Sequence, residues 1–111
     1  MIYKPYSIVI VPFPFTDNIR AKKRPALVLS RQAHQEKTGH VTLLMITSAK
    51  HSSWVSDHII SKLETTGLSA TSIVRQKIFT IDQRLVLNEI GYLSDYDKTV
   101  VLNQLNKHLY L

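Results

Sequence analysis

A run of basic residues, Arg20-Ala-Lys-Lys-Arg24-Pro25, is the densest group of side chains in the sequence that could hold a ligand. Three of its cations, Arg20, Lys22 and Lys23, are of the kind that faces water and attracts polyanions. Arg24 differs because Pro25 favours an extended backbone at the preceding residue, so its guanidinium projects from a rigid position. A guanidinium can form two parallel hydrogen bonds to a phosphate. The run predicts phosphate contact, with Arg24 as the residue nearest to any chemistry.

Two further polar groups stand where apolar runs end. Thr47 and Ser48 follow a run of buried-strand length, and their hydroxyls could close the strand locally or donate to a ligand. Taken alone, local closure is the favoured interpretation. Arg75 ends another apolar run and is followed directly by Gln76 and Lys77. If these strand ends converge, two arginines and a hydroxyl could hold one phosphate.

Other side chains of catalytic type form no familiar motif. The sequence lacks GxxxxGK[ST], GxGxxG, GxSxG and HExxH patterns, and its three glycines are too few for a glycine-rich phosphate loop. The five histidines lack ligand spacing, although His51 and His58 stand near Asp57, so a metal site is a minor alternative. We expect neither metal nor cofactor. Trp54 could stack on a base, but a lone tryptophan is more typical of a core or a subunit contact.

The elements that must position these residues read as short strands. Residues 6–15 are rich in β-branched and aromatic types, and Pro12 and Pro14 limit this strand to a sheet edge or a bend at its end. Apolar runs predict further strands near residues 25–30, 41–47, 58–61, 72–75, 77–81 and 85–93. Residues 16–23 and 31–39 read as loop and turn. Strands without alternating helices predict a mainly β barrel or sandwich.

The C-terminal segment is the exception to the β pattern. Ser94 stands three residues before Asp97, at the spacing of a capping box, and apolar residues then recur near the helical period. Acidic residues fall in the first turn and the basic pair Lys107 and His108 in the last, as the helix dipole favours. We predict one α-helix over about residues 95–108.

Length and charge fit a single domain, residues 1–111, with a basic N-terminal half. The net charge of +6 arises within residues 1–52, where eight Lys and Arg face only Asp17 and Glu36. A polyanion-binding surface and a merely solvated basic surface are both compatible with this bias. The sequence has no cysteine, no signal-peptide cleavage pattern and no apolar run of about 18 residues. We therefore expect a cytoplasmic protein that does not contact a membrane.

Several short segments in a fixed order carry a family resemblance. They are Ile8–Asp17 (IVIVPFPFTD), Lys23–Ser30 (KRPALVLS), Ile46–Ser48 (ITS), Gly67–Leu68, Ser72–Arg75 (SIVR), Phe79–Asp82 (FTID) and Ile90–Ser94 (IGYLS). Together they span nearly the whole chain and resemble the MazF/PemK toxins of type II toxin-antitoxin systems. The resemblance implies a small SH3-like β-barrel of the MazF/CcdB type with a C-terminal helix. It also implies a homodimer that cleaves single-stranded RNA without metal and is inhibited by a cognate antitoxin covering the RNA groove.

The resemblance assigns roles by position. Such enzymes promote attack of an RNA 2′-OH on the adjacent phosphorus, which gives a 2′,3′-cyclic phosphate and a 5′-OH. This chemistry requires a base, an acid and stabilisation of the more negative phosphorane. The implied catalytic residues are Arg24, Thr47, Ser48 and Arg75. The implied RNA-binding residues are Arg20, Lys22, Lys23, Gln76 and Lys77.

The general base stays open. Some relatives place a carboxylate shortly after the second arginine, but here the stretch reads Arg75-Gln-Lys-Ile78. The loop before Arg24 also lacks the histidine or glutamate that some relatives carry there. Asp82, His51 or His58 could supply the base, or water could act while the arginines stabilise charge.

Two alternative functions follow from the same segments. The missing carboxylate near Arg75 leaves room for a non-catalytic remnant that binds RNA or antitoxin. The barrel architecture leaves room for a CcdB-like gyrase poison. The latter is expected to end in a Trp-Gly-Ile type tail, whereas this chain ends in His-Leu-Tyr-Leu111.

Overall fold

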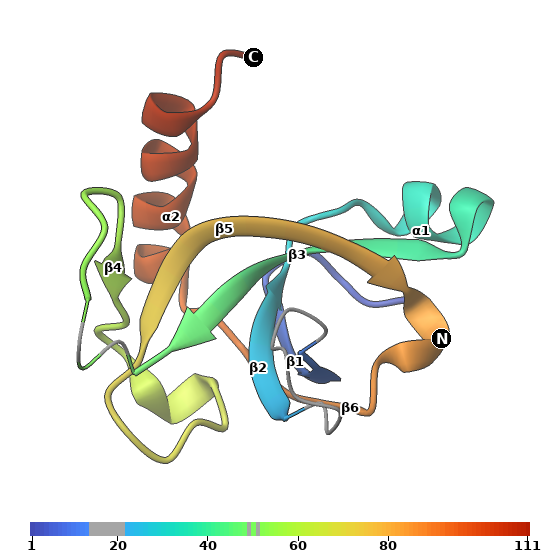
Figure 1. Cartoon of the computed structure of the whole chain (residues 1–111), viewed down its shortest axis with the longest axis horizontal. Helices are drawn as coiled ribbons and strands as arrows, with labels where there is room; N and C mark the ends of the chain where they lie inside the picture. The colour runs from blue at the N-terminus through green and yellow to red at the C-terminus, as the bar shows by residue number, and fades with distance from the viewer. Residues whose placement is uncertain (14–21, 49, 51) are drawn as a thin grey trace.

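The computed structural model of the chain describes residues 1–13, 22–48, 50 and 52–111. They form one curled antiparallel sheet with a long C-terminal helix beside it (Figure 1). In chain order the elements are β1 (Ser7–Pro12), β2 (Lys23–Val28), α1 (Gln32–Thr38), β3 (His40–Thr47), β4 (His58–Ile59), the 3₁₀ turn η1 (Leu63–Thr65), β5 (Ile73–Asp82), the 3₁₀ turn η2 (Gln83–Leu85), β6 (Asn88–Tyr92) and α2 (Asp95–His108).

The six strands pair in the order β4-β5-β3-β2-β1-β6. β1 therefore lies inside the sheet between β2 and β6, and Pro12 is its last residue. Of the two positions expected for this proline, the end of a strand is the one observed. The long β5 arches across the other strands, so that the sheet forms a half-barrel (Figure 1). The predicted fold class, a mainly β SH3-like barrel with a C-terminal helix, is confirmed.

Both faces of the sheet carry a cluster of buried side chains, and successive side chains of a strand point to opposite faces. Val9 and Val11 belong to one cluster of buried side chains, whereas Ile8 belongs to the other. This alternation explains why the strands read as continuous apolar runs. Each fully buried aliphatic side chain contributes about 1.5 to 3 kcal/mol to folding.

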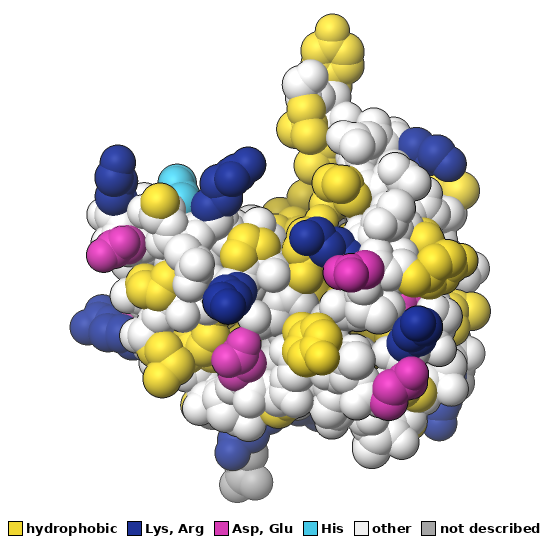
Figure 2. All heavy atoms as spheres, turned by 180° about the vertical axis from the view of Figure 1, so that it is seen from behind, with side chains coloured by type: hydrophobic (Ala, Val, Ile, Leu, Met, Phe, Trp, Pro, Cys, Tyr) yellow, Lys and Arg dark blue, Asp and Glu magenta, His cyan; other side chains and the backbone are white. Residues whose placement is uncertain are grey.

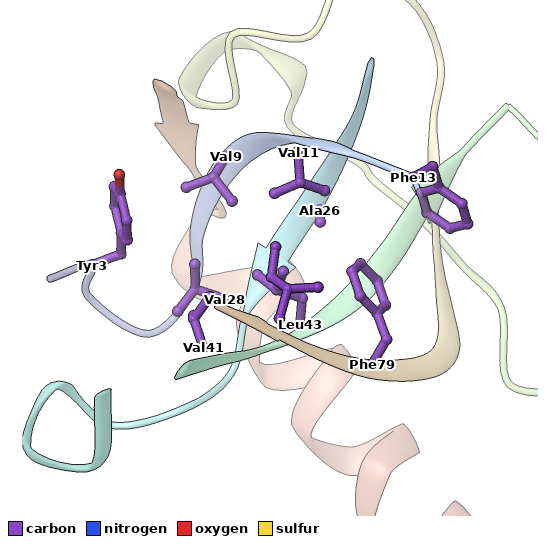
Figure 3. Close-up of a cluster of buried hydrophobic side chains, with 10 residues drawn as sticks. Tyr3, Val9, Val11, Phe13, Ala26, Val28, Val41, Leu43 and Phe79 are labelled. Atoms are coloured by element: carbon purple, nitrogen blue, oxygen red, sulfur yellow. The ribbon is translucent and has the colours of Figure 1, made fainter. Parts of the chain in front are cut away.

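The first cluster lies inside the curl of the sheet, and we call its side of the sheet the inner face (Figure 3). It joins residues of β1 to residues of β5, which are three places apart in the strand order, so the sheet must bend around it. Phe13 and Phe79 meet edge to face, with ring centroids 5.5 Å apart and planes at 61°. The buried members are Tyr3, Val9, Val11, Phe13, Ala26, Val28, Val41, Leu43, Phe79 and Ile81.

Helix α2 covers the opposite side of the sheet, which we call the helix face. Val101 and Leu105 of α2 pack there with strand residues such as Leu27 and Leu44. The Ser94 hydroxyl caps the helix by accepting a hydrogen bond from the Asp97 backbone N–H at 3.2 Å. The helix predicted over residues 95–108 is confirmed. Among the described residues, no helix is long and apolar enough to cross a membrane.

Residues 31–39, which the sequence indicated as a turn, instead contain the short helix α1. Its one buried side chain is Gln35, so α1 is attached to the rest of the protein by a polar side chain. The Gln35 side chain accepts from the Tyr3 N–H at 2.9 Å and donates to the Tyr3 carbonyl at 2.7 Å. The helix is held by this polar contact to the N-terminal segment, which no apolar periodicity could reveal.

Candidate functional site

Arg24 lies at the start of β2 on the inner face of the sheet. It pairs with Val11 of β1 and stands two residues before Ala26, and both of these neighbours belong to the inner cluster. Its side chain is half-buried. Pro25 follows within the same strand, opposite Ile10, so the backbone at Arg24 is extended as the sequence predicted. The inner apolar stripe of β2 therefore ends in a cation.

Thr47 and Arg75 lie on the same face, on the two strands that follow β2 in the sheet. Thr47 stands two residues beyond Met45, which packs against the inner cluster, and Arg75 pairs with Met45 across the β3–β5 ladder. The β2–β3 ladder ends at the pair Ala26–Met45. Three of the four candidate catalytic side chains thus extend one face at one end of the half-barrel.

Ser48 directly follows β3 and is exposed. β3 ends at Thr47, so the alternation of a strand does not determine which face the Ser48 side chain lies on. Ser48 is therefore placed beside the candidate site only because it follows Thr47 in the chain.

Arg75 of β5 is held by three residues of the segment before β4, namely Ser52, Trp54 and Asp57. Its Nε and Nη2 atoms donate to the two carboxylate oxygens of Asp57 at 3.1 and 2.8 Å. Nη1 donates to the Ser52 hydroxyl at 3.1 Å, and Nη2 also donates to the Ser52 carbonyl at 3.2 Å. The guanidinium carbon lies 5.1 Å from the centre of the Trp54 ring. Arg75 is 7% exposed, and its charge is neutralised within the protein by Asp57.

The ion pair changes the acid–base properties of both partners. The hydrogen bonds from Arg75 hold the pKa of Asp57 below its usual value, against the opposing effect of burial. The same hydrogen bonds raise the pKa of Arg75. Asp57 is therefore a charged partner for Arg75 and, while paired, a weak proton acceptor.

Asp57 is the site residue that the sequence did not reveal as a partner of Arg75. The carboxylate expected shortly after Arg75 is absent, and one arrives instead from 18 positions earlier in the chain. Its only sequence signal was its position near His58, which pointed to a metal site. Asp57 and His58 are neighbours in the chain but have different partners. Asp57 contacts Arg75, whereas His58 pairs with Val74 and contacts Asp97 of α2.

Gln76 lies on the helix face, away from the other candidates. The β3–β5 register shifts between the pairs Leu44–Ile78 and Met45–Arg75, which leaves Gln76 and Lys77 as a bulge. The Gln76 amide oxygen is 3.0 Å from Nδ1 of His108 in α2, and the side chain is buried. Lys77 is exposed. Gln76 and Lys77, which the resemblance assigned together to RNA, therefore differ: the first is buried against α2 and the second is exposed.

Two of the residues considered as the general base do not share the inner-face end that carries Arg24 and Thr47. Nε2 of His58 lies 2.7 Å from a carboxylate oxygen of the buried Asp97 on the helix face. Asp82 ends β5, seven residues from Arg75, which is roughly 20 Å along a strand. It is paired with Arg84 at 2.8 Å. The third, His51, lies outside the described residues.

The remaining predicted RNA contacts are exposed where the structure describes them. Lys22 and Lys23 are exposed at the start of β2, and Arg20 lies outside the described residues. The side of the molecule shown in Figure 2 mixes Lys and Arg with Asp and Glu. No group of three or more metal-ligating side chains occurs in the described part of the chain.

A small pocket of about 190 Å³ lies between the segment before β4 and the end of α2. It is lined by Val55, Ser56, Gln104, Lys107 and His108. Its volume is below the roughly 300 Å³ at which pockets for small-molecule ligands begin. It adjoins the helix and is separate from the inner face that carries Arg24 and Thr47.

Comparison with known proteins identifies the family. Residues 4–109 match the model of a family described as PemK-like, MazF-like toxin of type II toxin-antitoxin system. A comparison with curated proteins found no significant match.

Solved structures with the same fold include three toxins. A mycobacterial endoribonuclease in complex with its cognate antitoxin superimposes with a TM-score of 0.75 at 11% identity, covering 95% of this chain and 92% of that one. The Mycobacterium tuberculosis toxin MazF-mt6 gives 0.70 at 22% identity, with 91% and 93% covered. MazF in a MazE–MazF complex from Deinococcus radiodurans gives 0.75 at 19% identity, with 100% and 98% covered.

Proposed function

The chain belongs to the PemK-like, MazF-like toxins of type II toxin-antitoxin systems, and from that premise we propose that it is a metal-independent endoribonuclease acting on single-stranded RNA. The observation that carries the proposal is the common face of Arg24, Thr47 and Arg75 at one end of the half-barrel. We place the protein in the cytoplasm, as a homodimer inhibited by a cognate antitoxin. Antitoxin complexes of structural relatives support that partner.

In the proposed reaction, the 2′-oxygen of one ribose forms a bond to the adjacent phosphorus, and the bond from phosphorus to the 5′-oxygen breaks. The products are a 2′,3′-cyclic phosphate and a 5′-OH end. Arg24 forms two hydrogen bonds to the non-bridging oxygens, which carry most negative charge in the phosphorane. Thr47 and Ser48 position the phosphate through their hydroxyls.

Arg75 supports the site from behind, and its direct contact with a phosphate would require Asp57 or Ser52 to release it. Since His58 and Asp82 lie elsewhere, the 2′-OH proton passes to water or to His51, and the leaving 5′-oxygen gains its proton from solvent or Arg24. Lys22, Lys23 and Lys77, together with Arg20, attract the RNA backbone. Gln76 acts indirectly, by holding the bulge of β5 against His108.

The test is cleavage of labelled single-stranded RNA by the purified protein in EDTA. We expect products with 5′-OH ends, because metal is not required. Arg24→Ala is expected to lower the rate by at least about 100-fold, the effect of removing one oxyanion-stabilising donor. Arg31→Ala is the matched control, since Arg31 is an exposed arginine at the start of α1, and it should cleave normally. Equal rates for Arg24→Ala and the wild type would contradict the assignment.

A second candidate, RNA or antitoxin binding without cleavage, is favoured by one observation. The charge of Arg75 is neutralised by Asp57, so Arg24 would act without a second free arginine. Salt-sensitive RNA binding with no products at excess enzyme would select this candidate. Products that disappear in Arg24→Ala would reject it.

A further inference from the structure

Trp54 is exposed to solvent, yet its ring packs against a buried side chain. A core tryptophan lacks the first property, and a tryptophan in a mobile loop lacks the second. Its side chain is 44% exposed, although one side of the ring is covered by the Arg75 guanidinium at 5.1 Å. A cation over a tryptophan face is attracted by the ring quadrupole. One face of the ring is therefore occupied, and the exposed area belongs to the rest of the ring.

The support of the ring is itself rigid. Arg75 is buried and bound at both ends of its guanidinium by Asp57 and Ser52. The Trp54 backbone is tied to the same carboxylate, because its N–H donates to Asp57 at 2.9 Å. The Asp57 N–H in turn donates to the Trp54 carbonyl at 3.0 Å. Backbone and ring are thus fixed before any ligand arrives, which lowers the entropy lost on binding.

The location of the ring connects it to the proposed cleavage site. Arg75, on which Trp54 lies, shares the inner face with Thr47, and these residues stand on the paired strands β3 and β5. Ser52 and Ser53 beside the ring are exposed and uncharged, so a nearby phosphate meets no repulsion from them. Lys50 is exposed two residues earlier.

We propose that the exposed face of Trp54 stacks on one unpaired nucleobase of the RNA, next to the phosphate held by Arg24 and Thr47. This inference rests on the proposed function and adds a base-binding position to it. Single-stranded RNA presents its bases for stacking on aromatic side chains. Every base has such a face, so the platform contributes affinity and position and tolerates different bases.

The test uses the fact that the chain contains one tryptophan, so its fluorescence reports Trp54 alone. The probe is a single-stranded RNA with 2′-O-methyl riboses, which lacks the attacking hydroxyl and binds without being cut. We expect saturable quenching of the emission as this probe is added. Saturable binding, seen by anisotropy of a labelled probe, with unchanged tryptophan emission would overturn the proposal.

Variants measured by the same anisotropy assay give a second readout. Trp54→Ala should bind the probe roughly 5- to 150-fold more weakly, the range for the loss of one stacked base. Trp54→Phe keeps an aromatic face and should stay within a few-fold of the wild type. The control Tyr110→Ala removes another exposed aromatic, beyond α2, and should change nothing. Circular dichroism shows whether each variant is folded, and equal affinities for the Ala and Phe variants would count against stacking.

Three outcomes separate this inference from the proposed function. Cleavage that depends on Arg24 while Trp54 emission stays constant would retain the nuclease and reject the platform. Quenching by the probe without any cleavage of ordinary RNA would retain the platform and reject catalysis. Emission that changes only with protein concentration, and not with the probe, would identify the ring as a contact between protein subunits and overturn the proposal.

Discussion

At the scale of single residues, burial decides what the two described ion pairs between arginine and aspartate contribute. The Arg75–Asp57 and Arg84–Asp82 pairs have the same closest distance, 2.8 Å. The first pair has side chains 8% and 9% exposed, whereas the Arg84 side chain is 86% exposed. Removing one partner of a buried pair leaves an uncompensated charge, but a solvated partner is stabilised by water.

We therefore expect Asp57→Ala to lower the free energy of unfolding by about 3 kcal/mol. The matched change at the exposed pair, Arg84→Ala, should lower it by less than about 1 kcal/mol. Urea unfolding followed by circular dichroism measures both. The double variant Asp57→Ala with Arg75→Ala should be less destabilised than the sum of the single variants, because it leaves no lone charge. Additive effects would show that the two side chains are not coupled.

The candidate site was predictable only in part at this scale. Arg24 could be singled out because a neighbouring proline fixes its backbone, which is a local effect. The partner of Arg75 could not be predicted, because Asp57 is brought next to Arg75 by the pairing of β4 with β5. The contact of Gln76 with His108 could not be predicted either, because it depends on how α2 packs against the sheet.

At the scale of elements, Asp97 joins α2 to the segment around β4 and η1. This fully buried carboxylate accepts from the backbone N–H groups of Ser61 at 3.0 Å and Lys62 at 3.1 Å. It also accepts from the hydroxyls of Ser61 and Ser94 and contacts His58. Burial alone would raise its pKa, but these hydrogen bonds outweigh burial and lower it to about 2.

The low pKa predicts how stability depends on acid. Because the pKa of Asp97 is lower in the folded chain than in the unfolded one, its contribution is complete above about pH 4 and is lost as pH falls towards 2. The loss is about 2 kcal/mol, from roughly 1.4 kcal/mol per unit of pKa. Asp97→Asn should remove this part of the pH dependence in urea unfolding measured at pH 2, 3, 4 and 6.

Asp82→Asn is the control for that experiment. Arg84 also lowers the pKa of Asp82 by donating hydrogen bonds to it, but the Arg84 side chain is 86% exposed, so solvent screens this pair and weakens its effect. Its removal should alter the acid slope less than Asp97→Asn does. An equal effect of the two substitutions would contradict the role given to burial.

Elements with a local signal were the ones that the sequence predicted well. The bounds of α2 followed from Ser94 and Asp97, whose spacing places a cap, and from an apolar period. Helix α1 was missed because its seven residues are polar and its single buried side chain, Gln35, is held by hydrogen bonds. The two buried faces of the sheet removed the alternation that normally identifies which side of a strand is inside.

At the scale of the whole molecule, the excess of positive charge should control how RNA binding depends on salt. Each cation that contacts a phosphate releases counterions, which for single strands lowers the slope of log K against log salt by about 0.7. Lys22→Ala and Lys23→Ala should each reduce the magnitude of this slope by about that amount. The slope is measured by anisotropy of a labelled, 2′-O-methylated probe between low and high salt.

The control for the salt experiment is Lys98→Ala. Lys98 lies in α2 with its ammonium 5.2 Å from the centre of the Tyr6 ring, and Tyr6 hydrogen-bonds to Val28, at the other end of β2 from Lys22 and Lys23. Its removal lowers the net charge by the same unit and should leave the slope unchanged. A similar reduction for Lys98→Ala and Lys22→Ala would mean that only total charge matters.

The pairing of β1 with β6 sets an order of events during synthesis. Ser7 pairs with Tyr92, so β1, which can pair with β2 early, must wait for its second neighbour until residues 85 positions later are made. At translation speeds of 5 to 20 residues per second, this wait lasts about 4 to 17 s. Throughout that time Ile8 has no helix above it, because Val101 and Leu105 are made later still. A chain released before β6 is made therefore has every other strand of the sheet, β1 to β5, but cannot complete it.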